Sequence, residues 1–208
     1  MKAIIFDMDG TLLDSMSHWY ESGRIATEPY LKDDPEFIAQ MQKMSSQEIV
    51  RHISQNLTEE EKQEFKERWY QVMTDFYATK VKIKEGVIPY LKANKKKKIK
   101  MCVATATPRF MALKAIEHLG LSSYFEFLMD EEEAGVGKFR PDIYLKCAER
   151  LGYKPHECVV FEDNVRFSLV AKKAGFVVYG VYDDLSKRYQ EEMKVFCDRY
   201  IYSFKELL

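Results

Sequence analysis

The sequence of 208 residues has few cysteines and no long hydrophobic run. Its four cysteines, Cys102, Cys147, Cys158 and Cys197, include no Cys-x-x-Cys pair, which argues against a zinc site or a disulfide framework. The apolar runs are too short to span a membrane, and acidic residues follow the amino terminus too soon for a signal peptide. We therefore expect a cytoplasmic protein whose cysteines are reduced and lie in its core.

The sequence also lacks an excess of either charge, because 32 Lys and Arg residues balance 33 Asp and Glu residues. Near-neutrality argues against a general nucleic-acid or membrane surface. One basic cluster, residues 95–98 with Lys100, lies between a predicted helix and a predicted strand, and we interpret it as a solvated loop rather than a phosphate site. The sequence shows no exposed coiled-coil pattern that would indicate a partner chain, so we expect a monomer. We also expect it to bind neither nucleic acid nor membrane.

A short stretch near the amino terminus carries the strongest chemical signal. The apolar residues 3–6 predict a buried parallel strand, which Asp7 and Asp9 follow. Residues two apart on an extended chain point the same way, and two such carboxylates repel unless a cation or a shared proton separates them. Mg²⁺ prefers these oxygen ligands. Gly10 permits a tight turn after the strand. A calcium EF-hand loop counted from Asp7 is excluded, because Gly10 comes too early in it and its twelfth position is His18 rather than glutamate.

Residues from about Asp14 to Ile83 differ in character from the rest of the chain, because no strand-like run is found there and helix signals recur. Ser45-x-x-Glu48 and Thr58-x-x-Glu61 are capping boxes, and Asp34-Pro35 places a cap before a proline. Apolar residues then recur at helical spacing: Phe65, Trp69, Val72, Met73 and Phe76, with Trp19, Met41 and Met44 as further candidates. We predict an all-helical insert with a core of its own.

From Lys84 onward helices and strands alternate, which is typical of a parallel α/β sheet. The pattern predicts helices over 87–95, 109–119, 141–151 and 165–174, and a terminal helix from Ser203. It predicts strands over 99–104, 125–129, 158–161, 176–181 and 199–202. The core domain is therefore expected to be discontinuous, formed by residues 1–14 and 84–208.

Three further strand ends carry polar residues. Thr105 ends the strand before Pro108, where a hydroxyl and backbone N–H groups can cradle an anion. Lys138 offers a compact positive charge, and neither glycine-rich nucleotide fingerprint fits its surroundings. Glu162 and Asp163 end another apolar strand, and we expect Asp163 to reach a metal ion directly and Glu162 directly or through water.

Taken in order, these motifs resemble those of the haloacid dehalogenase-like phosphohydrolase superfamily: Asp7-Met8-Asp9-Gly10-Thr11, Thr105, Lys138 with Pro141-Asp142, and Glu162-Asp163. Two positions depart from the family pattern. Phe139 follows the lysine where Lys-Pro-x-Pro-Asp is usual, and Phe167 replaces the glycine of Glu-Asp-Ser-x-x-Gly. The resemblance implies a Rossmann-like three-layer parallel sheet with an inserted all-helical cap domain over residues 15–83.

The resemblance also implies a mechanism through an aspartyl-phosphate. Asp7 would be the nucleophile, Asp9 the general acid and base, and Thr105 and Lys138 would stabilise the transferring phosphoryl group. Mg²⁺ would be held by Asp7, the backbone carbonyl of Asp9, and Asp163, with Glu162 contributing. Contacts to phosphate or substrate are expected from Gly10, Thr11, Ser15, Trp19, Ala106, Thr107 and Arg109.

The helical insert is similar to that of the β-phosphoglucomutase-like subgroup, which contains sugar-phosphate mutases and phosphatases. Mutases of that kind carry an arginine in the cap loop and a histidine close to Trp19, and neither is found at the aligned positions. The resemblance therefore favours a phosphatase acting on a small phosphorylated metabolite, with a mutase as the alternative. Cap residues facing the site would set specificity, and His18 and residues 44–47 are candidates, although His18 is read first as a packing residue.

Two readings from other classes stay open. A phospho-accepting receiver domain also places acids and a lysine at strand ends, but it lacks a long helical insert. A binding module without turnover would be expected to lack part of the catalytic set, and no part is missing here. The cap is expected to open and close about hinges near residues 14–15 and 82–85.

Overall fold

The computed structural model describes residues 1–27, 29, 55 and 57–208. The chain forms two compact units, Met1–Ser15 with Val81–Leu208 and Met16–Lys80. We call them the core unit and the helical unit. The division expected from the sequence, 1–14 with 84–208, differs by one residue at the first boundary and by three at the second.

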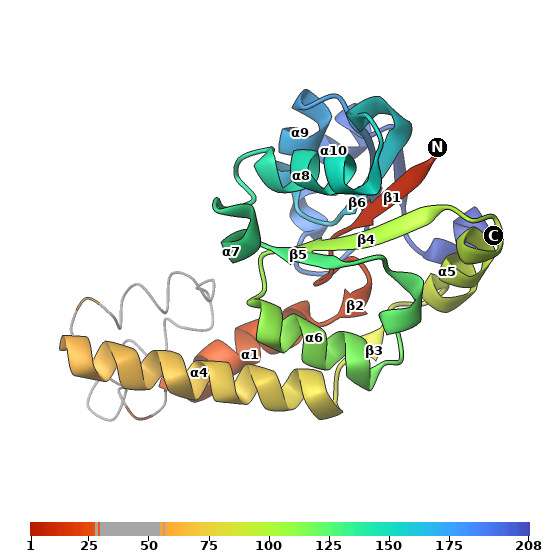
Figure 1. Ribbon diagram of the computed structural model, residues 1–208. Coiled ribbons are helices and arrows are strands. Elements are labelled where there is room, and N and C mark those ends of the chain that lie inside the picture. The colour runs from red at the N-terminus through yellow and green to blue at the C-terminus, as the bar shows by residue number, and fades with distance from the viewer. Residues whose placement is uncertain (28, 30–54, 56) are drawn as a thin grey trace. The chain divides into compact units, whose positions relative to one another are not determined.

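The core unit is built on a six-stranded sheet in which every neighbouring pair is parallel, as expected (Figure 1). The strand order is β5-β4-β1-β6-β7-β8. The strands are β1 Ala3–Phe6, β4 Lys100–Thr105, β5 Leu128–Asp130, β6 Cys158–Glu162, β7 Val177–Val181 and β8 Arg199–Ile201. The first strand lies in the middle, where the chain order reverses, and ligands bind at such switch points outside the carboxyl ends of the strands.

Helices cover both faces of the sheet and complete the predicted three layers (Figure 1). One face carries α5 Val87–Lys96 and α6 Arg109–His118, and the other carries α8 Asp142–Leu151, α9 Val165–Lys173 and α10 Gln190–Phe196. A short helix, α7 Glu131–Ala134, follows β5. The predicted terminal helix from Ser203 is instead a 3₁₀ turn, Phe204–Leu207.

The central strand is buried on both faces, which explains its uninterrupted apolar sequence. Ile5 belongs to a cluster with residues of α8 and α9, including Tyr144. Phe6 lies in the other layer, where its ring stacks on Phe161 with centroids 5.1 Å apart. Phe161 in turn stacks on Phe204, which fixes the end of the chain beneath the sheet. These contacts hold β1 and β6 in register, so that both strands end at the same edge.

A two-stranded ribbon within the core unit was not predicted from the sequence. β2 Leu13–Asp14 pairs antiparallel with β3 Lys82–Ile83, with Leu13 opposite Ile83 and Asp14 opposite Lys82. The expectation that residues 14–83 contain no strand is therefore wrong at its two ends. Strands of two residues are too short to show a period, and only their pairing defines them.

The helical unit contains α1 Met16–Thr27 and α4 Glu59–Thr79. The capping box of Thr58 and Glu61 is confirmed at the start of α4. The predicted apolar stripe is confirmed as well, because Phe65, Met73 and Phe76 are buried. The predicted helix starts at Asp34 and Ser45, and the candidates Met41 and Met44, lie outside the described residues.

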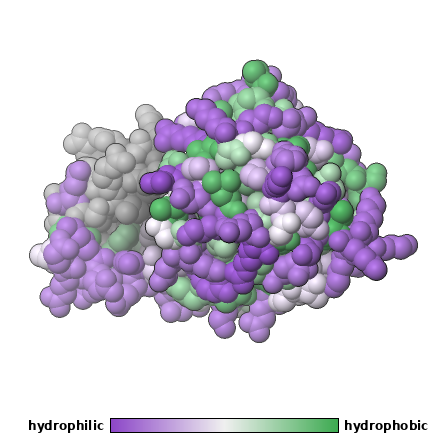
Figure 2. All heavy atoms as spheres, turned by 45° about the horizontal axis from the view of Figure 1, so that its top comes forward, coloured by the Kyte–Doolittle hydropathy of each residue, from purple (hydrophilic) through white to green (hydrophobic). Residues whose placement is uncertain are grey.

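The described surface is mixed in character. On the face drawn in Figure 2, hydrophobic residues lie singly or in small groups among hydrophilic ones. Isolated exposed apolar residues of this kind are normal on a globular protein. Within the described part of the chain, none of the helices combines the length and the apolar sequence needed to cross a membrane.

Candidate functional site

Three buried carboxylates meet at the carboxyl edge of the sheet. Asp7, Glu162 and Asp163 each place one carboxylate oxygen within 4.8 Å of the others. Phe6 of β1 lies opposite Phe161 of β6, and the Asp7 backbone N–H donates to the Phe161 carbonyl at 2.9 Å. The sheet register therefore brings together acids that are more than 150 positions apart in the sequence.

Lys138 links two of these carboxylates. Its Nζ lies 2.6 Å from Asp7 Oδ1 and 2.5 Å from Glu162 Oε1, and it donates to the Ala104 carbonyl at 3.1 Å. The side chain is fully buried. Its backbone N–H donates to Glu131 Oε1 at 2.6 Å, which anchors the loop that carries it. All three hydrogens of the ammonium group are thus used, and its position is fixed.

The charged groups of this cluster shift one another's pKa values. Burial alone would lower the pKa of Lys138, but Asp7 and Glu162 outweigh burial and raise it above its ordinary value, so the ammonium stays charged. Burial, together with the Asp7 charge, raises the pKa of Glu162 to about 7 against the opposing pull of Lys138 and Tyr144. Burial and the charges of Asp7 and Glu162 also raise the pKa of Asp163 well above its usual range.

The donor set fits a hard divalent cation. Asp7 Oδ2 is buried and has no hydrogen-bond partner among the described residues. A buried carboxylate oxygen without a partner is costly, and bound Mg²⁺ takes such oxygens as ligands. Asp163 offers a second ionisable oxygen whose charge a cation would stabilise. Glu162 is more fully engaged, because its Oε1 accepts from both Lys138 and Tyr144.

Asp9 lies in the turn that follows β1 and is oriented by two hydroxyl groups. Ser15 Oγ donates to one of its carboxylate oxygens and Thr107 Oγ1 to the other, each at 2.6 Å. Gly10 has a φ of +80°, a conformation that a side chain would disfavour, and its N–H donates to the Leu13 carbonyl. Ser15 and Thr107 were expected to contact phosphate or substrate, and the structure shows their hydroxyls holding Asp9.

The other predicted phosphate contacts surround the same strand ends. Thr105 is buried, and its Oγ1 accepts a hydrogen bond from the Thr107 backbone N–H at 3.0 Å. Ala106 is exposed between them. Thr11 is fully buried, and its hydroxyl has no partner among the described residues.

Arg109 does not join this group. Its guanidinium donates to the Leu128 carbonyl at 2.7 Å and to Glu133 at 2.8 Å, which ties the start of α6 to β5 and α7. Its backbone N–H donates to Asp130, whose side chain also caps α7. In this structure the charge of Arg109 is paired with a carboxylate, and its expected substrate contact stays a prediction.

The cap candidates are used in packing within the helical unit. Trp19 Nε1 donates to the Tyr77 hydroxyl at 2.8 Å, and its ring meets Trp69 edge-on at 5.5 Å. His18 stacks on Phe76 with centroids 3.8 Å apart, which agrees with its interpretation as a packing residue. The expected substrate contact of Trp19 is thus seen as a contact between α1 and α4. Residues 44–47 lie outside the described part of the chain.

Aromatic residues around Lys138 were missed by sequence reasoning. The Tyr144 hydroxyl donates to Glu162 at 2.7 Å, and its ring centroid lies 5.5 Å from the lysine Nζ. The Phe167 centroid lies 5.1 Å from the same nitrogen. Phe167 also meets Phe139 edge-on at 5.0 Å, so the two departures from the family pattern contact each other. The departure of both Phe139 and Phe167 from the family pattern was the only sign of this contact in the sequence.

A second missed feature is an ion pair beside the acidic cluster. Lys84 Nζ lies 2.9 Å from Asp183 Oδ2, and both side chains are largely buried. Asp183 adds to the raised pKa of Asp163, and Lys84 opposes it. No motif marks either residue, because Lys84 follows a two-residue strand and Asp183 lies in the loop after β7.

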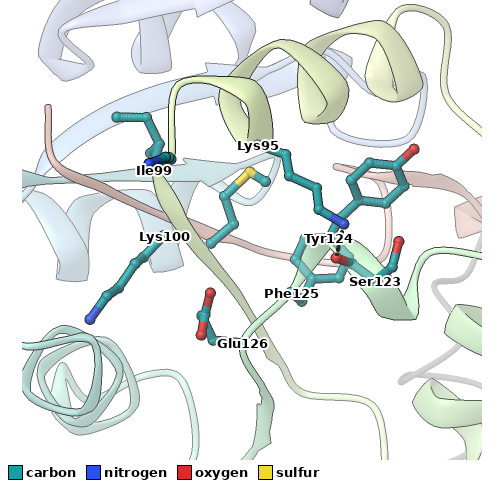
Figure 3. A pocket seen from close by; sticks show the side chains of 9 residues that line it. Lys95, Ile99, Lys100, Ser123, Tyr124, Phe125 and Glu126 are labelled. Atoms are coloured by element: carbon teal, nitrogen blue, oxygen red, sulfur yellow. Dashed lines mark hydrogen bonds between the residues drawn. The ribbon is translucent and has the colours of Figure 1, made fainter.

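A cavity of about 340 Å³ opens at the amino end of β4, the opposite end of that strand from the acidic cluster (Figure 3). It includes the basic cluster found in the sequence. Lys95 donates to the Ser123 carbonyl at 2.8 Å, and Lys100, which extends away from Ser123 in Figure 3, donates to the Leu151 carbonyl at 3.1 Å. Residues 95 and 96 end α5, where lysines complement the helix dipole. The cluster is therefore partly helical rather than entirely a loop, and the charges of Lys95 and Lys100 have structural partners.

Comparison with known proteins agrees with this site. A family model described as haloacid dehalogenase-like hydrolase matches residues 1–175. A protein of Thermotoga maritima named phosphorylated carbohydrates phosphatase is 33% identical over 189 residues, covering 89% of this chain and 88% of its own length. The β-phosphoglucomutase of Bacillus subtilis is 28% identical over 191 residues, covering 87% and 83% respectively.

A solved structure shows the same fold. The chain matches a HAD hydrolase of Entamoeba histolytica with a TM-score of 0.80 and 24% identity, covering 100% of this chain and 96% of that one. At this level of identity the match bears on the fold alone. It agrees with the parallel sheet and the inserted helical region described above.

Proposed function

The chain belongs to the haloacid dehalogenase-like hydrolases, and on that premise we propose that it is a Mg²⁺-dependent phosphatase acting on a small phosphate monoester. The observation that carries the proposal is the meeting of Asp7, Lys138, Glu162 and Asp163 at one sheet edge, with Asp9 beside them. Three separate segments supply these groups: the turn after β1, the loop of Lys138 and the end of β6. Few arrangements other than phosphoryl transfer use a carboxylate nucleophile, a buried ammonium and an oriented second acid together.

Asp7 is the proposed nucleophile. Lys138 donates to its Oδ1 and so fixes the direction of the carboxylate. In the first step a carboxylate oxygen bonds to phosphorus while the bond from phosphorus to the ester oxygen breaks. In the second step water attacks phosphorus, the aspartyl-phosphate bond breaks, and inorganic phosphate leaves. The covalent intermediate divides one difficult displacement into two easier ones.

Asp9 is the proposed general acid and base. It gives its proton to the departing ester oxygen in the first step and takes one from the attacking water in the second. The hydroxyls of Ser15 and Thr107 fix the direction of its carboxylate. This orientation matters because proton transfer requires the donor to be within hydrogen-bond reach of the reacting oxygen.

The remaining groups stabilise charge. Lys138 faces the nucleophile, and Thr105 ends the neighbouring strand, where hydroxyl and N–H groups can bind phosphoryl oxygens. The proposed ligands of Mg²⁺ are Asp7, the backbone carbonyl of Asp9, and Asp163, with Glu162 contributing. When bound, the ion offsets the repulsion between the carboxylate and the phosphate.

The proposed substrate is a phosphorylated metabolite such as a sugar phosphate. The enzyme is proposed to be a monomer and to act in the cytoplasm. The name of the Thermotoga relative, a phosphatase of phosphorylated carbohydrates, supports this class. A sugar phosphomutase is the second candidate, supported by the likeness to the Bacillus β-phosphoglucomutase. The missing arginine and histidine at the expected cap positions favour the phosphatase.

The test is a phosphate-release screen over small monoesters with and without Mg²⁺. We expect release that requires Mg²⁺ and is abolished in Asp7→Asn, together with an acid-stable phosphoenzyme in the wild type. Asp9→Asn should retain metal binding but lose about 10²–10⁴ in rate. A phosphoenzyme that persists in Asp7→Asn would remove the nucleophile assignment. Adding a sugar bisphosphate separates the candidates, since a mutase would interconvert sugar monophosphates and a phosphatase would not.

A further inference from the structure

Lys84 contacts the turn that carries Asp9 at two points. Its backbone N–H donates to the Leu12 carbonyl at 2.9 Å, and its Nζ donates to the Gly10 carbonyl at 2.5 Å. One residue from the distant end of β3 thus binds both sides of the turn. Gly10 directly follows Asp9, so a bond to the Gly10 carbonyl restrains the backbone one peptide beyond the proposed acid.

The Lys84 ammonium has no further donor to offer. Besides Gly10 it donates to the Tyr182 carbonyl at 2.6 Å and pairs with Asp183 at 2.9 Å. An ammonium group has three hydrogens, and each is used. The side chain is only 16% exposed, and that of Asp183 only 6%. A flexible lysine held at three acceptors in this way acts as a rigid link between the turn after β1 and the loop after β7.

The turn itself is closed by short backbone bonds. Leu12 and Leu13 donate to the Met8 carbonyl, and Gly10 donates to Leu13, each at 2.9 Å. Ser15, which holds the Asp9 carboxylate, comes directly after β2. Because β2 pairs with β3, and Lys84 follows β3, the same small assembly positions both the backbone and the carboxylate of Asp9.

From these contacts we propose that Lys84 is a positioning residue for Asp9, a role that rests on the proposed phosphatase function. It keeps the turn in the form that aims the acid at the leaving oxygen. The opposing interpretation is that Lys84 only neutralises the buried Asp183. The two differ in their consequences, because removing Asp183 leaves both carbonyl contacts of Lys84 in place.

The test compares Lys84→Met with Lys82→Met, using phenyl phosphate and p-nitrophenyl phosphate with Mg²⁺. Lys82 is an exposed lysine two residues before Lys84, on β3. p-Nitrophenolate leaves readily without protonation, whereas phenolate, the anion of an acid with a pKa of about 10, needs the proton from Asp9. We expect Lys84→Met to lower kcat/KM for phenyl phosphate by about tenfold or more, and for p-nitrophenyl phosphate clearly less. Lys82→Met should change neither.

Two further variants keep the inference testable if Lys84→Met is poorly folded. Lys84→Arg retains the charge and should recover part of the loss, and Asp183→Asn should cost less than Lys84→Met. In an Asp9→Asn background, Lys84→Met should add little, since residues that act through one another are not additive.

Equal losses on both esters, or full additivity with Asp9→Asn, would overturn the inference. A greater loss in Asp183→Asn than in Lys84→Met would assign the effect to charge neutralisation instead. A wild-type protein that releases phosphate neither from these esters nor from any monoester of the screen would refute the proposed function itself, which separates the two failures.

Discussion

The environment of Asp163 disfavours its charged form when no metal ion is bound. Three carboxylates meet one ammonium in a buried space, and Lys138 contacts only two of them. Burial and the charges of Asp7 and Glu162 raise the pKa of Asp163. Protonation then favours the folded state, so the protein without metal should lose stability as the pH rises above the ordinary carboxyl range of about 4.

Asp163→Asn should therefore stabilise the metal-free protein while removing its response to Mg²⁺. The gain is expected to be about 1–2 kcal/mol, because a strained buried charge becomes a neutral amide of the same shape. For a chain of this size each 1 kcal/mol corresponds to a shift of about 2–4 °C in Tm. Thermal melts with and without Mg²⁺ measure both effects.

Asp184→Asn is the matched control, because Asp184 is an exposed acid in the loop after β7. It should keep the rise in Tm that a ligand bound only to the folded state produces. An unchanged Mg²⁺ response in Asp163→Asn would show that this carboxylate is not a ligand.

The sequence predicted the residues whose chemistry is unusual and missed those whose role depends on their neighbours. Asp7, Asp9 and Asp163 could be found because each comes just after an apolar strand, and parallel strands end at one edge. Lys138 follows the short helix α7 instead, and the motif around it marked it in the sequence. Lys84 has no such signal, since its acceptors are backbone carbonyls that only the folded turn presents. Arg109 was assigned to substrate because a positive charge near a phosphate site is expected, while the competing carboxylate of Glu133 is distant in the sequence.

At the scale of elements, the loop of Lys138 and the first turn of α9 are joined by an aromatic pair. Phe139 is 61% exposed and meets the half-buried Phe167 edge-on. Phe167 covers the ammonium of Lys138 at 5.1 Å. Position 167 is where the family pattern has a glycine. Here it carries a phenylalanine, whose ring contacts that of Phe139.

A double-mutant cycle of Phe139→Ala and Phe167→Ala should reveal coupling between the two elements. Edge-on aromatic pairs contribute about 0.5–1.5 kcal/mol beyond area burial, and the exposure of Phe139 places this pair near the lower value. Urea unfolding of the four proteins measures it. Phe167→Leu, which keeps much of the volume but not the ring, is the control, and additive losses would show that the rings act independently.

The start of α5 depends on a glycine at a close approach of two elements. Gly86 has a φ of +82°, and a Cβ placed there would lie 2.5 Å from the Lys205 backbone nitrogen and 2.8 Å from the Phe204 carbonyl carbon. The 3₁₀ turn at the end of the chain therefore packs directly on this residue. Both obstacles are backbone atoms, which cannot rotate away.

Gly86→Ala should consequently cost more than the strain of its backbone conformation. That strain alone is about 1–2 kcal/mol, and the clash should bring the loss to about 3 kcal/mol or more. Gly152→Ala is the control, since Gly152 has a φ of +87° and open space around the added carbon. Equal losses of unfolding free energy in urea would show that the terminal turn moves aside freely.

The alternation of helices and strands could be predicted because each core element is long enough to show its period. The predicted strand over 125–129 is displaced to Leu128–Asp130, because residues 126 and 127 bond to β4 from an irregular segment before the strand. The ribbon of β2 and β3 could not be predicted, since its pairing connects positions almost 70 residues apart.

At the scale of the molecule, the core unit holds every residue proposed for chemistry, although its chain is interrupted by the helical unit. The two ends of the inserted segment lie close together in space, because Asp14 lies opposite Lys82 in the antiparallel ribbon. An insert whose ends meet can be removed without stretching the remaining chain. The core unit should then retain its own hydrophobic layers on both faces of the sheet.

We therefore expect a protein in which residues 16–80 are replaced by Asn-Gly to fold cooperatively, since Ser15, Asn-Gly and Val81 then form a four-residue connection between Asp14 and Lys82, a length that β-hairpins use. Asp7, Lys138 and Asp163 all remain, so Mg²⁺ should still raise Tm. Hydrolysis of p-nitrophenyl phosphate should persist at a lower rate and hydrolysis of the metabolite should be lost, as expected for removal of a cap that excludes water and sets specificity.

Far-UV circular dichroism suits this measurement, because both tryptophans, Trp19 and Trp69, belong to the helical unit. In the full-length protein, tryptophan fluorescence follows the helical unit alone, and Mg²⁺ should leave it nearly unchanged while it stabilises the core. A shortened protein without a cooperative transition would show that the core needs the helical unit to fold. One that folds but no longer responds to Mg²⁺ would show that the helical unit supplies a ligand, and the proposed metal site would then have to be redrawn.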